Sequence, residues 1–106
     1  MVTITKNSNM VTLINVFTVE PEKQQKLIDL LIQATEKTMR HLPGFISANI
    51  HRSLDGKQVA NYAQWRSHQD FEAMLHNPDA SGHMQEIASF TKFAPNLYDV
   101  VESIQA

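Results

Sequence analysis

Cysteine is absent from this sequence of 106 residues. Its absence excludes disulfides, thiolate metal sites and a cysteine nucleophile, and it is compatible with a reducing compartment. The chain also has no apolar run long enough for a membrane span, and residues 1–9 do not resemble a signal sequence. We therefore expect a cytoplasmic protein that has no membrane partner.

An excess of positive charge is also missing. The 9 Lys and Arg residues are scattered and are outnumbered by 11 Asp and Glu residues, which gives a formal net charge of -2. Nucleic acid is therefore not an expected partner. Because the sequence has neither a glycine-rich phosphate loop nor the spacing typical of metal ligands, we expect no metal site.

The residues that are present predict one globular domain. Hydrophobic residues make up 42% of the chain and charged residues 19%, which is ordinary for such a domain. Residues 1–9 are a predicted polar tail. Alternating apolar residues predict strands over 10–19, 45–54, 59–66 and 97–104. Apolar stripes at helical spacing, bounded by Pro and Gly, predict helices over 21–42, 67–75 and 79–90. This βαββαβ order over 10–106, with a broken second helix, predicts an α+β, ferredoxin-like fold with an antiparallel sheet.

The first predicted strand is apolar on both faces, although helices cover only one face of such a sheet. The uncovered face needs a partner, which is most simply a second copy of the chain. We therefore predict a homodimer in which two sheets pack through Ile14, Val16, Ile46, Ala48 and Tyr62.

The turn at Asp55-Gly56 decides which residues face Asn61. A two-residue type I′ turn would place Ile50 opposite Asn61. A type I turn with Gly56 in the left-handed region and a G1 bulge would shift the register, so that Asn49 and His51 join Asn61. We favour the bulge, because Gly56 stands where the left-handed residue belongs.

Three polar side chains are expected on the helix-covered face of the sheet. Asn15 alternates with apolar neighbours, and Asn61 and Trp65 share a face of their strand with small Ala63 between them. A buried amide without a partner costs about 1–3 kcal/mol. Either these groups satisfy one another, or they line a pocket whose missing partner is a ligand.

Sequence motifs resemble the antibiotic biosynthesis monooxygenase family. The segments T-L-I-N-V-F, V-A-N-Y-A-Q-W-R-S and F-E-A-M-L, with a later helix near G-H-M, carry this resemblance over nearly all the chain after Met10. It implies a dimeric α/β barrel and a cofactor-independent oxygenase that converts a phenolic or anthrone-like polycycle to a quinone with O2. It also implies that Asn15, Asn61 and Trp65 are catalytic and that His51 lines the pocket.

Further residues are expected to bind the small aromatic substrate. His83 shares a helical face with Phe90 and should point inward, and either His51 or His83 could transfer a proton near neutral pH. The expected substrate-binding residues are His51, Asn49, Phe71, Met74, His83 and Phe90, and Met84 should help to shape the pocket.

Two alternative functions share this fold. One is a protein that binds a small molecule, or isomerises a small carbonyl compound, without oxygenation. The other is haem degradation, which the resemblance makes less favourable because Met74 stands where the haem-degrading relatives have a Trp.

Overall fold

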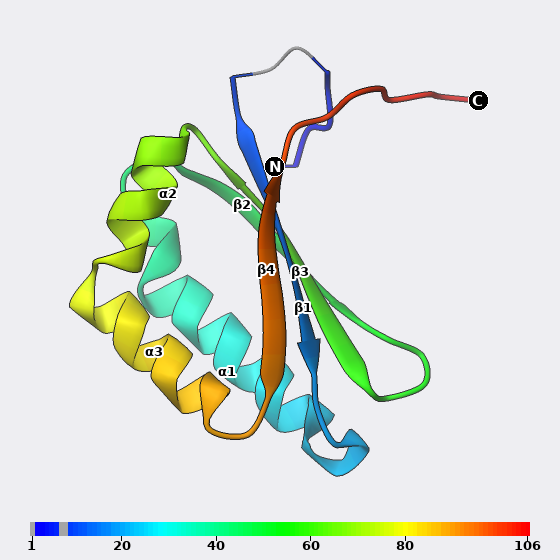
Figure 1. The fold of residues 1–106 in the computed structure, drawn as a ribbon, viewed down its shortest axis with the longest axis vertical. Helices are drawn as coiled ribbons and strands as arrows, with labels where there is room; N and C mark the ends of the chain where they lie inside the picture. Colours follow the sequence, from blue (N-terminus) through cyan, green and yellow to red (C-terminus); the bar gives the residue numbers. More distant parts are fainter. Residues whose placement is uncertain (1, 7–8) are drawn as a thin grey trace.

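The computed structural model describes residues 2–6 and 9–106. Its antiparallel sheet has the strand order β2-β3-β1-β4, with β1 at Val11–Thr18, β2 at Phe45–Arg52, β3 at Gln58–Trp65 and β4 at Lys92–Tyr98 (Figure 1). The helices are α1 at Gln24–Lys37, α2 at His68–Leu75 and α3 at Pro78–Ala88, with 3-10 turns η1 at Pro21–Lys23 and η2 at Met39–His41. The predicted βαββαβ order and antiparallel sheet are confirmed. None of these helices in the described ranges is long and apolar enough to span a membrane.

Local side chains explain why α2 and α3 are separate helices. Ser67 caps α2 by accepting a hydrogen bond from the Asp70 N–H at 3.1 Å, as the sequence predicted. Hydrogen bonds from Arg66 and then from Ser67 hold the pKa of Asp70 below its usual value, so this carboxylate stays ionised near the positive helix end. Asn77 caps α3 in the same way, and Pro78 at its first turn cannot continue α2.

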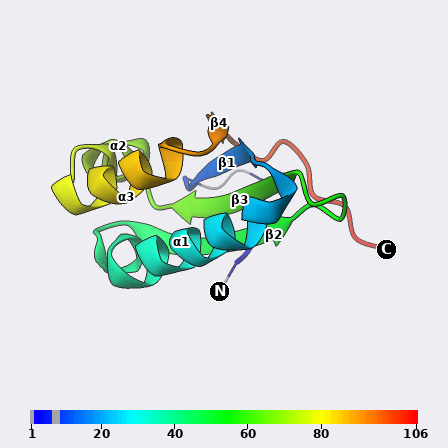
Figure 2. The ribbon, with the colours of Figure 1, turned by 90° about the horizontal axis from the view of Figure 1, so that it is seen from below.

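All the helices lie on one face of the sheet (Figure 2). Two clusters of buried side chains fill the space between the layers. The first includes Leu13, Ala63, Trp65, Phe71 and Met74, and the second includes Phe17, Leu27, Leu31, Val59 and Ile87. On β1 and β3, Asn15 and Asn61 stand between these clusters, because they alternate with members of both.

The β2–β3 hairpin differs from the favoured prediction. Gly56 has a φ of 81°, so its left-handed conformation is confirmed. However, the Ser53 N–H donates to the Gln58 carbonyl at 2.9 Å, which leaves 54–57 as a loop of even length. The register therefore has the parity of a two-residue turn, and Ile50 lies opposite Asn61. The predicted bulge shift is wrong.

The last strand also begins earlier than predicted. It covers Lys92–Tyr98, whereas residues 99–106 form no regular structure. Pro95 lies inside β4 and pairs with Asn15. A proline is tolerated there because β4 is an edge strand, on which one side needs no hydrogen-bond donor.

The uncovered face of the sheet is more polar than predicted. Ala48 points to the helices, since it pairs with Ala63, and Ile46 falls at an irregularity in β2. On the uncovered face, Ser47 donates to Gln64 at 3.0 Å, and the Gln64 amide donates to the Thr3 carbonyl at 2.6 Å. Part of the predicted tail thus lies on the sheet, while residues 1, 7 and 8 of that tail are outside the described ranges.

Candidate active site

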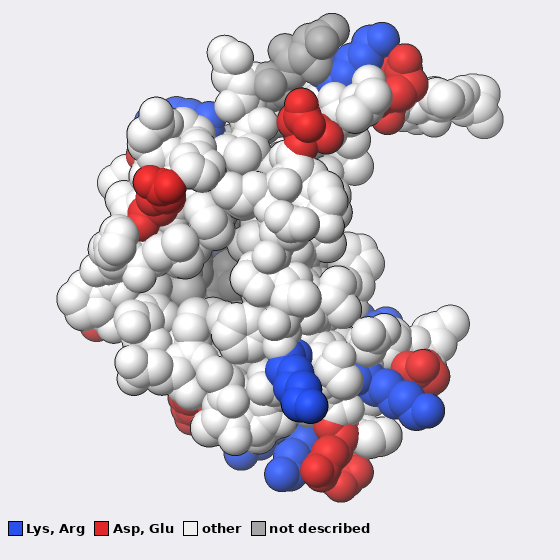
Figure 3. Space-filling view, in the orientation of Figure 1, with Lys and Arg blue, Asp and Glu red and all other residues white. Residues whose placement is uncertain are grey.

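A cavity of about 470 Å³ lies between the sheet and the helices. This volume is within the range of about 300–1,000 Å³ that is usual for small-molecule sites. Its roof includes Leu31 and Ala34 from α1, Phe71 and Met74 from α2, and Met84 from α3. Figure 3 shows a hollow between the helices and β4, and no charged residue is coloured at its rim.

The floor of the cavity consists of residues that lie side by side on the four strands. The alanine row contains Ala48, Ala63, Leu13 and Leu97, in the order of the strands across the sheet. The asparagine row, two residues away on each strand, contains Ile50, Asn61, Asn15 and Pro95. All of these side chains except that of Ile50 line the cavity.

Asn15 and Asn61 form a directly opposed pair on β1 and β3. Such cross-strand neighbours have Cβ atoms about 4.5–5.5 Å apart. The Oδ1 atoms of both residues are buried, and neither accepts a hydrogen bond from any described residue. Two adjacent amide groups therefore stand in an apolar cavity with unused hydrogen-bonding capacity.

Trp65 forms the end wall of the cavity beyond the alanine row. Its side chain is 2% exposed and packs edge-on against Phe45, with ring centres 5.6 Å apart and planes at 90°. Phe71 contacts it from α2, with a centroid distance of 6.3 Å. These contacts fix the orientation of the indole ring in the wall.

Comparison with known proteins gives the family. Residues 10–86 match the sequence profile described as antibiotic biosynthesis monooxygenase, ABM. This region contains both asparagines of the floor and Trp65, and it is most of the chain. The chain belongs to the ABM family. The resemblance found in the sequence motifs is therefore confirmed, and the chain is a monooxygenase.

Individual relatives agree with this assignment. The ABM chain is 47% identical over 106 residues to tetracenomycin-F1 monooxygenase from Streptomyces glaucescens, which covers 100% of this chain and 95% of the relative. A Streptomyces coelicolor monooxygenase from the gene ActVA-Orf6, solved with the ligand nanaomycin D, has a TM-score of 0.80 and 26% identity over 93% of each chain. SnoaB, a cofactor-independent oxygenase from Streptomyces nogalater, shares the fold, with a TM-score of 0.75 and 20% identity over 93% of this chain and 100% of its own.

The structure of this ABM protein brings together part of the predicted site. Five of the predicted residues line the cavity, namely Asn15, Asn61, Trp65, Phe71 and Met74. Met84, predicted to shape the pocket, also lines it. The chemical roles of these residues remain predictions.

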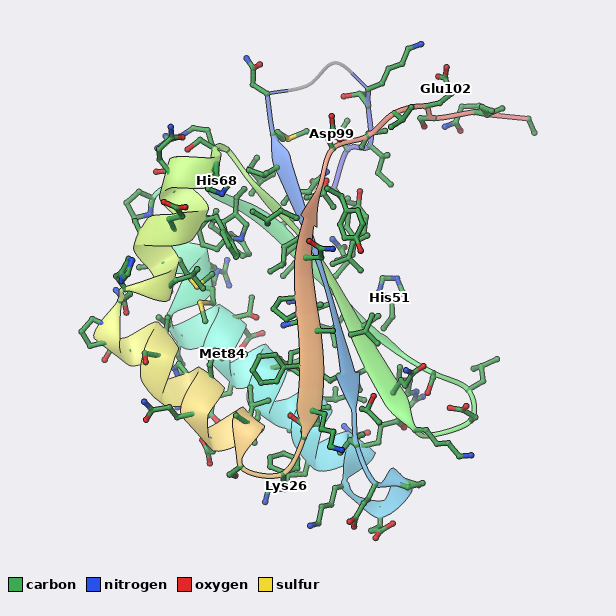
Figure 4. The ribbon with its side chains drawn as sticks, viewed as in Figure 1. Lys26, His51, His68, Met84, Asp99 and Glu102 are labelled. Carbon is green, nitrogen blue, oxygen red and sulfur yellow. The ribbon has the colours of Figure 1, made fainter. Side chains whose placement is uncertain are left out.

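Asn49 and His51 do not line the cavity, and their predicted placement is wrong. The hairpin register pairs Asn49 with Tyr62 and His51 with Ala60, so both point to the uncovered face. The Asn49 amide donates to the Tyr62 carbonyl at 3.1 Å, and His51 Nδ1 lies 3.0 Å from the Asn49 carbonyl oxygen. Figure 4 shows His51 on the side of the sheet away from the helices.

His83 and Phe90 are also outside the cavity lining. His83 points inward from α3, but its Nε2 lies 3.0 Å from the Thr38 hydroxyl at the end of α1. Phe90 follows α3 and lies beneath the Lys26 ammonium group, 4.6 Å from it. Consecutive side chains on a helix are rotated by about 100° about its axis. Met84 therefore faces the cavity and His83 does not.

Sequence reasoning missed the contribution of β4. Phe93, Pro95 and Leu97 alternate along this strand and line the cavity. The signal was this alternation of apolar residues, which the proline in its centre concealed. Because an edge strand accepts proline, this apolar alternation can be recognised as that of a strand.

No titratable side chain lines the cavity among the described residues. Its polar groups are amides, the Thr35 hydroxyl and the Trp65 indole, and the Thr35 hydroxyl already donates to the Leu31 carbonyl at 2.8 Å. Elsewhere in the described part of the chain, no three His, Asp or Glu residues are grouped so that they could hold a metal ion. The cavity can therefore offer neutral hydrogen bonds and apolar contact.

Proposed function

We propose that this protein is a cofactor-independent monooxygenase that oxidises a ring methylene of an anthrone-like phenol to a carbonyl, giving a quinone and water. The observation that carries the proposal is the pair of adjacent asparagines whose buried Oδ1 atoms have no partner among the described residues of an apolar cavity. The name of the relative that is 47% identical, tetracenomycin-F1 monooxygenase, supports the same class of substrate.

Binding would place the flat ring system between the sheet and the helical roof. Leu13 below and Met74 and Met84 above supply apolar surface. Methionine side chains adapt their shape easily, which suits a wall that contacts a rigid ring. A phenol O–H of the substrate can donate to the Oδ1 atoms of Asn15 and Asn61, which lack a partner. Carbonyl oxygens of the substrate can accept from the amide N–H groups of the same residues.

Electrostatic stabilisation is the main contribution that these amides can make. Loss of a proton from the ring methylene gives a carbanion whose charge moves onto the neighbouring carbonyl oxygen. Amide N–H groups of Asn15 and Asn61 can stabilise this oxyanion, and such a donor is worth roughly 10²- to 10³-fold in rate. Because the lining of the cavity is mostly apolar, these hydrogen bonds are stronger than in solution.

The substrate itself supplies the electrons. The carbanion passes one electron to O2, and the two radicals combine to form a carbon–oxygen bond and a peroxide anion. Protonation gives a hydroperoxide, which loses water to leave the carbonyl. One oxygen atom of O2 therefore enters the quinone and the other leaves in water, so the electrons balance without a further reductant.

The initial proton acceptor is not a side chain of the cavity, since none of the described lining residues is titratable. Water or hydroxide at the open rim is the remaining acceptor. In this scheme the pH dependence of the rate follows ionisation of the substrate.

The test uses a dihydroxyanthrone and the purified protein with no added metal, flavin or haem. We expect O2 uptake above the rate of spontaneous oxidation, and label from ¹⁸O2 in the quinone. A chelator should leave the rate unchanged, because the substrate is the reductant. Binding of the anthrone without O2 uptake would instead favour a binding protein or an isomerase, and loss of the rate on chelation would contradict the mechanism.

We further propose that the protein is a homodimer joined through the uncovered face of the sheet. Ile14 and Val16 on β1 and Ala60 and Tyr62 on β3 form an apolar strip at its centre. A stable pair commonly buries about 1,200–2,000 Å² in total. This strip replaces the predicted one, which wrongly included Ala48.

Light scattering tests the dimer. We expect a mass of about 24 kDa, twice the 12.0 kDa of one chain. Val16→Glu places an unpaired charge in the strip, so it should shift the mass toward one chain. Leu54→Glu at the fully exposed hairpin tip is the control and should not. A single-chain mass for the unaltered protein would end this proposal.

A further inference from the structure

Three methionine side chains line the cavity from three different elements. Met39 begins η2, Met74 lies on α2, and Met84, which Figure 4 labels, lies on α3. Most of the chain's 5 methionines therefore face one space. Met10, just before β1, is not among the lining residues. No thiol competes with these thioethers for an oxidant, because the chain contains no cysteine.

The thioethers stand on both sides of the asparagine pair. Met74 is 8% exposed and belongs to the buried cluster that contains Trp65, and Met39 packs against the same cluster. Met84 packs against the other cluster. Since the two asparagines lie between these clusters on the sheet, a substrate carbon placed over them has a thioether toward each end of the cavity.

The hydroperoxide of the proposed reaction must lose water before the carbonyl forms. That elimination removes a second proton from the ring carbon, and no lining residue among those described has a titratable side chain that could accept it. Proton removal therefore depends on water at the rim, whereas oxygen transfer to sulfur needs no base. A thioether beside the peroxide competes with the elimination.

We propose that the cavity methionines are a self-oxidation site, at which the hydroperoxide converts Met39, Met74 or Met84 to the sulfoxide and so inactivates the enzyme. The inference rests on the proposed function for the source of the peroxide. A sulfur lone pair attacks the terminal peroxide oxygen, so that an S–O bond forms and the O–O bond breaks. The sulfur loses two electrons and the peroxide gains them. The oxygen that stays on carbon takes up the peroxide proton, and the substrate leaves as a ring alcohol.

Oxidation changes the chemical character of the cavity roof. A sulfoxide is polar and chiral, whereas the thioether is apolar and flexible. An S=O group then faces a ring system that is bound mainly through apolar contact. KM for the phenol should therefore rise with each oxidised side chain, and activity should be lost in proportion to completed turnovers and not to elapsed time.

An aromatic hydroperoxide tests the site without turnover. The probe is cumene hydroperoxide, and tandem mass spectrometry measures the added oxygen at each methionine. Burial alone favours oxidation of Met10, which is more exposed than Met74. We expect the cavity methionines to react at least about fivefold faster than Met10, because an apolar cavity concentrates the aromatic probe.

A bound quinone provides the control for this experiment. A dihydroxyanthraquinone that fills the cavity should protect Met39, Met74 and Met84 and leave the oxidation of Met10 unchanged. Faster oxidation of Met10 in the absence of quinone, or no protection by the quinone, contradicts the proposal.

Turnover tests the source of the oxidant. With a dihydroxyanthrone and O2, sulfoxide at the cavity methionines should increase in proportion to the O2 consumed. Catalase should not change the amount, because the peroxide reacts before it leaves the cavity. Sulfoxide that disappears when catalase is added would show an oxidant from solution and would overturn the proposal, and so would inactivation without sulfoxide.

A triple variant, Met39→Leu with Met74→Leu and Met84→Leu, removes the thioethers by an exchange that usually preserves packing. Relative to its own initial rate, it should lose activity at least about threefold more slowly per turnover. Met10→Leu makes the same exchange outside the cavity and should inactivate like the unaltered protein. Equal inactivation of the triple variant and Met10→Leu contradicts the proposal. If thermal unfolding shows that the triple variant does not fold, the two experiments on the unaltered protein decide.

Failure of the proposed function is distinguishable from failure of this inference. No O2 uptake, together with quinone-protected oxidation of the cavity methionines by cumene hydroperoxide, removes the oxygenase but keeps the oxidation site. O2 uptake without sulfoxide in the cavity removes the oxidation site alone.

Discussion

Replacing Asn61 with alanine should lower kcat by roughly 10²-fold, with a smaller change in KM. Asn61 and its cross-strand neighbour Asn15 contribute amides to the cavity floor. Neither Oδ1 atom accepts a hydrogen bond from a described residue. Their N–H groups stabilise charge that develops on the substrate oxygen only after the proton has left. The loss therefore falls on the chemical step and is measured by steady-state O2 uptake with a dihydroxyanthrone.

Asn49→Ala is the matched control for this experiment. Asn49 is an asparagine on the neighbouring strand, but it points to the opposite face of the sheet. Its removal should leave kcat unchanged. An Asn61→Ala variant as active as the unaltered protein would contradict the role of the amide, and a large loss in Asn49→Ala would contradict the hairpin register.

Trp65→Ala should lower the free energy of unfolding by about 3–5 kcal/mol, which is the usual cost of removing a buried Trp or Phe side chain. Trp65 is 2% exposed and contacts Phe45 and Phe71, so its removal leaves a gap beside an existing cavity. This is a large part of the 5–15 kcal/mol that stabilises a typical domain. Denaturant unfolding followed by circular dichroism measures it.

Trp65→Phe separates stability from chemistry. It keeps an aromatic ring in the end wall but deletes the indole N–H, so most of the stability should remain. A fall in kcat in this folded variant would indicate that the N–H acts on a peroxide oxygen. Leu54→Ala, at the exposed hairpin tip, is the stability control. A Trp65→Ala variant as stable as that control would show that the edge-on contacts contribute little.

The sequence predicted the pair at the centre of the site because strand periodicity is local. Asn15 lies among alternating apolar residues, and Asn61 and Trp65 are separated by an even number of positions. Their faces follow from the period of two alone. The βαββαβ order could be predicted for the same reason, since the apolar patterns and capping residues of each element are local.

Residues whose position depends on contacts between elements could not be predicted in this way. Asn49 and His51 were assigned to the cavity through the hairpin register, and the hydrogen bond between Ser53 and Gln58 decides that register. His83 was assigned through a helical face whose partner turned out to be α1 at Thr38. In each case the local pattern allows two faces, and packing against another element selects one.

The even length of the hairpin loop at 54–57 also restricts which insertions and deletions the protein can tolerate at this position. A single codon inserted or lost there would either bulge outward or exchange the two faces of β2, which would move Ala48 out of the cavity and bring the His51 side chain in. A change of two codons would preserve the faces. Among descendants of this sequence, the length of the loop should therefore vary in steps of two.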